Sequence, residues 1–169
     1  GTQSISTVGF APEFVWIKQR TAPNRDHVLH DIIRGSNKVL YANLTNSQDT
    51  LNASYFTSFD SNGFTLGGDS YYNGSSLDYV AWSWKGGGTA VSNTDGTIAS
   101  SVSANQAAGF SIASYTSTGT NGSTFGHGLN AIPELVLLKC TSTNSTNWIV
   151  GGSILGNDYY LSLNSGNAR

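Results

Sequence analysis

The sequence contains an internal repeat. The segment PEFVWIK at residues 12–18 returns as PELVLLK at residues 133–139, an offset of 121 residues. Matched apolar positions over such a length indicate duplication of one structural unit, so we predict that both copies fold alike. With the same offset and no gap, the match continues through Val28 and Ile149, Leu29 and Val150, Ile33 and Ile154, Gly35 and Gly156, Leu40 and Leu161, and Asn43 and Asn164.

The two copies differ in extent. At the same offset Arg169 matches Gln48, so the second copy has no counterpart of SFDSNGFTL (58–66) or DYVAWSWKGGG (78–88). The first copy has no counterpart of AGFSIASYT (108–116). The sequence therefore reads as part of a longer array with an incomplete second unit. We expect neighbouring sequence or another chain to cover strand edges that this leaves unpaired.

The remaining pattern predicts β-structure. Short apolar runs lie between clusters of Gly, Asn, Asp and Ser, which is typical of an all-β protein. The pairs Asn62-Gly63, Asp95-Gly96 and Asn73-Gly74 predict tight turns. We predict a β-sandwich-like fold of two related antiparallel units, with strands at 14–20, 27–33, 39–42, 54–59, 64–66, 77–85, 97–103, 110–115, 134–140, 148–151 and 159–163.

The best candidate boundary is the run Gly86-Gly87-Gly88, which ends an apolar segment and precedes a polar one. It divides the chain into a first β unit at residues 1–88 and a connector rich in Ser, Thr and Asn at residues 89–104. The connector contains a predicted hairpin turn. The second β unit, incomplete at its end, then occupies residues 105–169.

The composition is poor in charge. Charged residues make up 11% of the chain, against about 25% in an average globular protein. Asn, Ser, Thr and Gly supply 77 of the 169 residues, and the net charge is −2. Such a surface argues against a nucleic-acid partner, and the absence of a long apolar run argues against membrane insertion. The one cysteine, Cys140, is expected to be a small buried apolar residue.

The segment YVAWSWK at residues 79–85 alternates in polarity. Side chains of a strand point to opposite faces with a period of two, so Val80, Trp82 and Trp84 share one face. We predict that this face packs in the core. The alternative is a platform on which a sugar ring stacks.

Few residues favour catalysis. Glu13 and Glu134 are the only glutamates and could form the carboxylate pair of a glycosidase. They occupy equivalent repeat positions, however, which favours a structural role in each unit. His27 and His30 lie three positions apart, and because this spacing is odd they fall on opposite faces of a strand, which argues against a metal site. We predict no catalytic residue, no metal and no cofactor.

One loop favours ligand binding. The segment GGDSYYNGSS places two tyrosines among small polar residues, where no core is needed. Aromatic faces beside amides and hydroxyls suit sugars, because CH groups stack on rings while amides bond to hydroxyls. The predicted ligand-binding residues are Asp69, Tyr71, Tyr72 and Asn73. The alternative is a loop that packs down or contacts a neighbouring subunit.

Several motifs carry a resemblance over nearly the whole chain: GFAPEFVWIKQR, HVLHDIIRG, SFDSNGFTLGG, YVAWSWKGGG, SNTDGTIASSVSANQAAGFSIASYT and GHGLNAIPELVLLK. The sequence resembles an uncharacterised β-rich domain of virion structural proteins from marine tailed phages, including cyanophages and pelagiphages, near lectin-like sandwich modules. The motifs are structural, so the resemblance implies no active-site residue.

This resemblance implies a non-enzymatic virion component on a tail fibre, tail appendage or capsid surface, located on the virion surface and extracellular. The expected partners are other virion chains, including copies of itself, and host-surface polysaccharide. Two alternatives remain: a purely structural decoration or assembly module, and a depolymerase that cleaves host polysaccharide.

Overall fold

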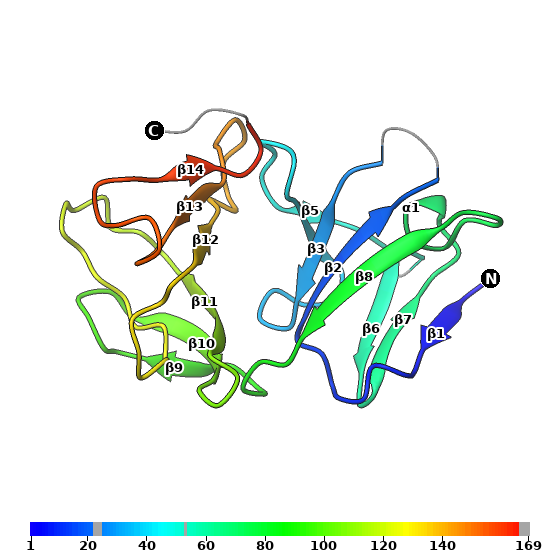
Figure 1. The fold of residues 1–169 in the computed structure, drawn as a ribbon, viewed down its shortest axis with the longest axis horizontal. Coiled ribbons are helices and arrows are strands. Elements are labelled where there is room, and N and C mark those ends of the chain that lie inside the picture. The colour runs from blue at the N-terminus through cyan, green and yellow to red at the C-terminus, as the bar shows by residue number, and fades with distance from the viewer. Residues whose placement is uncertain (22–24, 53, 166–169) are drawn as a thin grey trace.

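The computed structural model describes residues 1–21, 25–52 and 54–165. Two halves lie side by side, and both consist mainly of antiparallel sheets (Figure 1). The first half has a five-stranded sheet of order β5-β4-β3-β2-β8, formed by β2 (Phe14–Gln19), β3 (Val28–Asp31), β4 (Lys38–Tyr41), β5 (Asp49–Thr50) and β8 (Tyr79–Trp84). Its second sheet has the order β1-β7-β6, formed by β1 (Gln3–Ile5), β6 (Phe56–Asp60) and β7 (Gly63–Leu66).

The core of the first half lies between these two sheets. Alternate residues of β2, Val15 and Ile17, point into it and are 0% and 1% exposed. From the opposite sheet, the rings of Phe56 and Phe64 stack with centroids 5.6 Å apart. Strand alternation thus buries one face of β2. The buried cluster consists of Val15, Ile17, Val28, Val39, Phe56, Phe64, Leu66 and Tyr72.

The turn at Asn62-Gly63 joins β6 to β7, as predicted, and Gly63 lies opposite Asp60. A Cβ atom at Gly63 would lie 1.6 Å from the carbonyl oxygen of Ile5, so β1 can approach only a glycine here. The predicted turn at Asn73-Gly74 is wrong. Residues Ser70–Asn73 form the short helix α1, which ends at Gly74 with φ −73°.

The second half has two three-stranded sheets. The first, of order β11-β10-β9, contains β9 (Val91–Asn93), β10 (Ser100–Asn105) and β11 (Phe110–Tyr115). The second, of order β12-β13-β14, contains β12 (Val136–Leu138), β13 (Ile149–Gly151) and β14 (Leu161–Ser162). The predicted connector, residues 89–104, therefore contains β9 and most of β10. The division of the chain at residue 88 stays a prediction.

The strand registers confirm the repeat. Trp16 pairs with Leu29 between β2 and β3, and Leu137 pairs with Val150 between β12 and β13. Each member of the second pair lies 121 residues after its counterpart. The next interface agrees too, because the pairing of Leu29 with Leu40 returns as that of Val150 with Leu161. The predicted all-β fold with two related antiparallel units is therefore confirmed.

Side-chain hydrogen bonds repeat at the same offset. Asn43 Oδ1 accepts from the backbone N–H of His27 at 2.8 Å, and Asn164 Oδ1 accepts from that of Trp148 at 2.7 Å. The Lys18 ammonium donates to a carbonyl seven residues downstream at 2.6 Å. Its counterpart, Lys139, does so at 2.8 Å. Two copies that share strand register and side-chain bonds have the same local fold.

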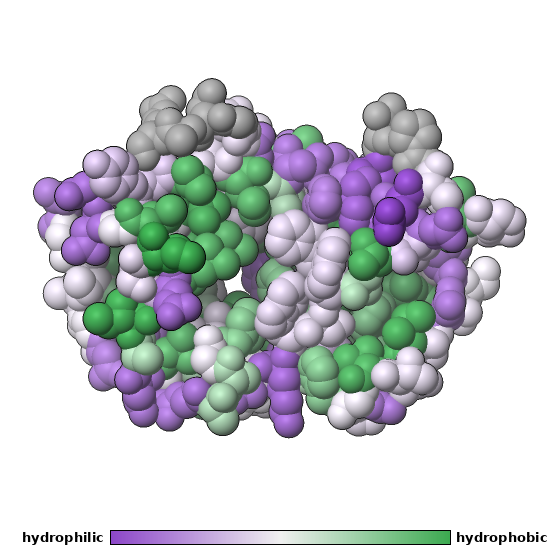
Figure 2. Space-filling view, in the orientation of Figure 1, coloured by the Kyte–Doolittle hydropathy of each residue, from purple (hydrophilic) through white to green (hydrophobic). Residues whose placement is uncertain are grey.

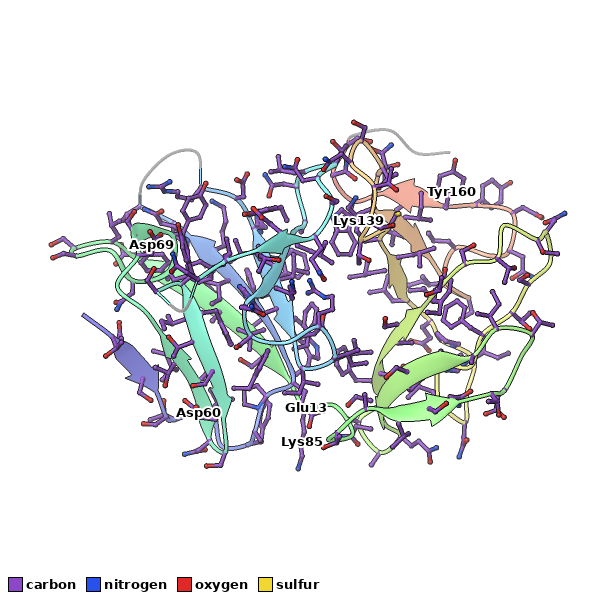
Figure 3. All side chains as sticks on the ribbon, turned by 180° about the vertical axis from the view of Figure 1, so that it is seen from behind. Glu13, Asp60, Asp69, Lys85, Lys139 and Tyr160 are labelled. Carbon is purple, nitrogen blue, oxygen red and sulfur yellow. The ribbon has the colours of Figure 1, made fainter. Side chains whose placement is uncertain are left out.

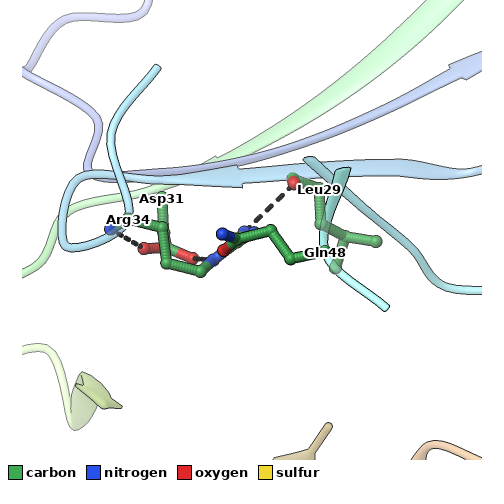
Figure 4. A network of polar contacts seen from close by, with 4 residues as sticks. All are labelled: Leu29, Asp31, Arg34 and Gln48. Carbon is green, nitrogen blue, oxygen red and sulfur yellow. Dashed lines mark hydrogen bonds and ion pairs between the residues drawn. The ribbon is translucent and has the colours of Figure 1, made fainter. Parts of the chain in front are cut away.

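One polar network distinguishes the first copy. The turn after β3 is held by Arg34, whose guanidinium bonds to the Asp31 carboxylate, to the Leu29 carbonyl at 3.2 Å and to Gln48 Oε1 at 3.4 Å (Figure 4). The Arg34 backbone N–H also donates to Asp31 at 2.9 Å. Leu155 stands at the position of Arg34 in the second copy. This network is therefore not part of what the repeat requires.

The predicted strands are found close to their expected bounds, whereas β1, β5 and β9 were not predicted. Cys140 is exposed, so its prediction as a buried residue is wrong. No helix of the described ranges is long and apolar enough to span a bilayer.

Candidate functional site

The structure places the four predicted ligand-binding residues at α1 (Figure 3 labels Asp69). Asp69 caps the helix, because its Oδ1 accepts from the backbone N–H of Tyr71 at 2.8 Å. Tyr72 is 2% exposed and its hydroxyl lies 2.8 Å from His30 Nε2. Tyr72 therefore belongs to the core and presents no ring face to solvent.

The other two residues also have partners. Tyr71 is half-buried, and the Arg25 guanidinium lies 4.2 Å from its ring centre, which is a cation–π contact. Asn73 donates to the backbone carbonyls of Gly67 at 3.1 Å and Gly1 at 2.9 Å. These contacts explain the local fold. Ligand binding at the four residues stays a prediction.

A larger aromatic surface lies on the face of the five-stranded sheet that points away from the β1-β7-β6 sheet, beside the cluster of Leu29, Leu40, Ala42 and Trp148. On β8, Trp82 is 45% exposed and Trp84 is 37% exposed. The ring of Trp82 meets that of Trp16 edge to face at 6.0 Å, and Trp84 meets Phe14 in the same manner at 5.3 Å. Phe110 of the second half stacks on Trp84 at 6.1 Å. We call these five residues the aromatic face.

The aromatic face corrects a prediction. The sequence predicts that Val80, Trp82 and Trp84 point into the core, but Tyr79, on the other face of β8, is the residue that packs against it. Trp82 lies opposite Trp16, which packs against the buried cluster around Trp148 and not in the core between the two sheets. Alternation shows that two faces differ but not which one is buried. On the edge strand β8, the more apolar face remains outside.

The imidazole of His27 is part of the same surface. Its Nδ1 accepts from Trp16 Nε1 at 3.0 Å, and its ring meets the Trp16 ring edge to face. Burial lowers the pKa of His27, and the nearby Lys18 ammonium lowers it further. Both effects favour the neutral ring that can accept this bond. His27 thus fixes the orientation of the Trp16 indole.

The junction between the halves lies beside the aromatic face, and Figure 3 shows Glu13 and Lys85 there. The Glu13 carboxylate accepts from the backbone N–H of Gly88 and from the hydroxyl of Ser103, both at 2.9 Å. An open depression of about 490 Å³ adjoins these residues and is lined by Glu13, Lys85, Gly86, Gly87, Gly88, Ala104, Asn105 and Gln106. The Glu13 carboxylate therefore joins the two halves.

A second set of contacts joins the halves at their other end. Trp148 is 5% exposed and packs against Leu29 and Leu40, and its Nε1 donates to the Tyr41 carbonyl at 2.8 Å. Asn144 Oδ1 accepts from the Ser47 backbone at 2.8 Å. The space-filling surface is hollowed between the two halves (Figure 2). Phe110 reaches the aromatic face from the second half, so both halves contribute to that surface.

This arrangement can bind an uncharged ligand by stacking and hydrogen bonding. Exposed indole rings offer apolar faces, and the amides of Asn105 and Gln106 line the adjoining depression. The described residues contain no group of three His, Cys, Asp or Glu that could hold a metal ion. Sequence reasoning weighed Trp82 and Trp84 as a sugar platform. It missed Trp16 and Phe14, which only the pairing of β2 with β8 brings beside them.

Comparison with known proteins adds a family. No curated protein and no solved structure matches the chain at a significant level. A family model described as a domain of unknown function (DUF7483) matches residues 1–169, the whole sequence. The chain belongs to the DUF7483 family.

Proposed function

We propose that this protein is a non-enzymatic binding module that holds a neutral saccharide on its aromatic face. The observation that carries the proposal is the pair of half-exposed indoles, Trp82 and Trp84, on the outer side of the sheet. Solvent-exposed tryptophans in one row are costly for a monomer unless a ligand or partner covers them. A sugar ring covers such a row with its CH groups.

The charge of the chain favours a sugar over a charged ligand. The net charge is −2, and only 11% of residues are charged. Amides and hydroxyls provide the polar groups near the aromatic face, and these bond well to sugar hydroxyls. Glu13, the acidic residue beside the face, is occupied by the bonds from Gly88 and Ser103, which favours binding over glycoside cleavage.

The biological setting is part of the proposal. The resemblance of the quoted motifs to virion structural proteins of marine tailed phages supports a position on a fibre, appendage or capsid surface. In that position, the saccharide is a polysaccharide of the host surface. A depolymerase and a purely structural module remain the rival functions.

The exposed area of the tryptophans gives an estimate of the binding free energy. A tryptophan side chain buries up to about 250 Å², so 45% exposure of Trp82 leaves about 110 Å² open. A sugar that covers half of this area at about 25 cal/mol per Å² gains about 1.4 kcal/mol, or about tenfold in Kd. Trp84→Ala should cost a similar amount.

The test is a glycan array probed with the full chain, followed by titration of a bound polysaccharide. We expect Trp82→Ala and Trp84→Ala each to weaken binding about tenfold. Tyr159→Ala is the matched control, because Tyr159 is 66% exposed and lies outside the aromatic face. Equal binding by the tryptophan variants would refute the proposed site. Absence of any bound glycan would favour the structural role, and shortening of the polysaccharide would favour the depolymerase.

A further inference from the structure

The two copies of the sheet differ sharply in how far their apolar residues are covered. Val15 is 0% exposed, whereas its counterpart Val136 is 38% exposed. Ile17 is 1% exposed, and its counterpart Leu138 is 38% exposed. These residues occupy the same strand positions, with the same register to the next strand. The difference therefore comes from what packs on the sheet and not from the sheet itself.

The first half shows what covers this face. The β6–β7 hairpin lays Phe56, Phe64 and Leu66 over Val15 and Ile17. Tyr72 of α1 completes the same cluster. In the described part of the chain, no hairpin of this kind packs on β12–β13–β14, and the side chains that would meet it remain exposed.

The outer edge of the sheet also differs between the two copies. In the first half, β8 pairs along the whole of β2, with Gln19 opposite Tyr79. Gln19 is 2% exposed, whereas Cys140, its counterpart in the second copy, is exposed. The outer edge of β12 carries no strand within the described ranges. The backbone groups along this edge are therefore free to pair.

We propose that the inner face and free edge of β12–β13–β14 form a docking site for a polypeptide segment built like residues 56–84. Such a segment has an aromatic β-hairpin that covers Val136 and Leu138, followed by a strand that pairs with β12. The chain already makes this contact once, between residues 56–84 and β2–β3–β4. The occupant is thus defined by its chemistry: apolar rings on one side of a hairpin and an adjoining β-strand. The inference does not depend on saccharide binding.

The single native thiol offers a direct probe. Hydrogen bonds from Ser142 and Thr143 lower the pKa of the exposed Cys140 thiol to about 7, so the free chain should react rapidly with a disulfide reagent at neutral pH. A strand that pairs along the edge of β12 would place Cys140 in the environment of Gln19. Protection of this thiol therefore reports docking.

A segment of this kind can be fused to the chain in the register of the repeat. Since Arg169 matches Gln48 at the offset of 121, a copy of residues 49–88 joined after Arg169 continues the repeat. We expect the Cys140 thiol to react at least about tenfold more slowly in this fusion than in the unfused chain, because a covered thiol reacts only through local opening. The matched control carries Phe56→Asp and Phe64→Asp in the appended copy alone and should restore the fast reaction.

A disulfide tests the register independently of these rates. The neighbouring Arg20 N–H donates to the Asp78 carbonyl at 2.7 Å, so Gln19 and Tyr79 are a non-hydrogen-bonded pair. Such pairs have Cα atoms about 4.5 Å apart, within disulfide range. Tyr79→Cys in the appended copy should therefore crosslink to Cys140 on mild oxidation, whereas Val80→Cys, on the opposite face, should not.

Thiol protection and the crosslink together test the docking site. Protection with the register-specific crosslink supports the docking site. Fast thiol reaction in the fusion together with equal or absent crosslinking at both positions overturns it. Protection of the unfused chain that rises with its concentration, accompanied by self-association in sedimentation, would show that a second copy covers the face and would also overturn the proposal.

Discussion

The matched valines of the two copies provide a quantitative test of this architecture. Val15→Ala removes two buried methyl groups, which costs about 1.6 kcal/mol in transfer free energy and about 1 kcal/mol for the cavity. Val15 is 0% exposed, so the full cost of about 2.5 kcal/mol applies. Val136→Ala at the equivalent position should cost only about 1 kcal/mol, because Val136 is 38% exposed and its loss opens no closed cavity.

The assay is urea denaturation of both variants and the parent, followed by far-ultraviolet circular dichroism. The free energy of unfolding should fall more for Val15→Ala, by about 1.5 kcal/mol. Both variants replace a valine by alanine at equivalent positions of the two sheets, so the loss of β-propensity is the same in each and cancels in the comparison. Equal destabilisation would refute the claim that only the first copy is covered on this face.

Other features give further tests. Burial lowers the pKa of His30 from 6.5 to about 3, so the unfolded chain binds more protons between these values. Stability should therefore fall as the pH drops from 6.5 towards 3, and denaturation curves of His30→Gln should lose this dependence. A parallel dependence in both proteins would exclude His30 as its source. Glu13→Ala removes the acceptor of Ser103 and should loosen the junction, raising amide exchange at residue 88 while that of β3 is unchanged; unchanged exchange at both sites would contradict this. Asn43→Ala and Asn164→Ala each remove the acceptor of the backbone N–H just before a strand and should each cost about 1 kcal/mol in thermal or urea melts, whereas an effect from only one would contradict equivalent roles.

The sequence predicts the repeat well because register depends on local features. The apolar positions of β2 and β12 recur at one offset, and the capping amides Asn43 and Asn164 recur with them. The strand register of each copy is therefore determined by residues within that copy. The all-β class follows from the same short apolar runs.

What the sequence could not predict depends on contacts between distant elements. The burial of Tyr72 requires contact with His30, 42 residues away in sequence, and with Val15 and Ile17 of β2. The exposure of Trp82 follows from the position of β8 at the edge of its sheet, which alternation does not reveal. Cys140 is exposed for the same reason, since its counterpart Gln19 is covered only because β8 pairs there.

The most direct test of the central claim is a nuclear Overhauser spectrum of the full chain with labelled valine methyl groups. The account predicts cross-strand contacts between Val15 and His30 and, equally, between Val136 and Gly151, since both pairs face each other across antiparallel strands. It also predicts contacts from the Val15 methyls to the ring of Phe56, and none from Val136 to any ring of that hairpin. Helical sequential contacts around Val136, or a missing Val136–Gly151 contact, would contradict it.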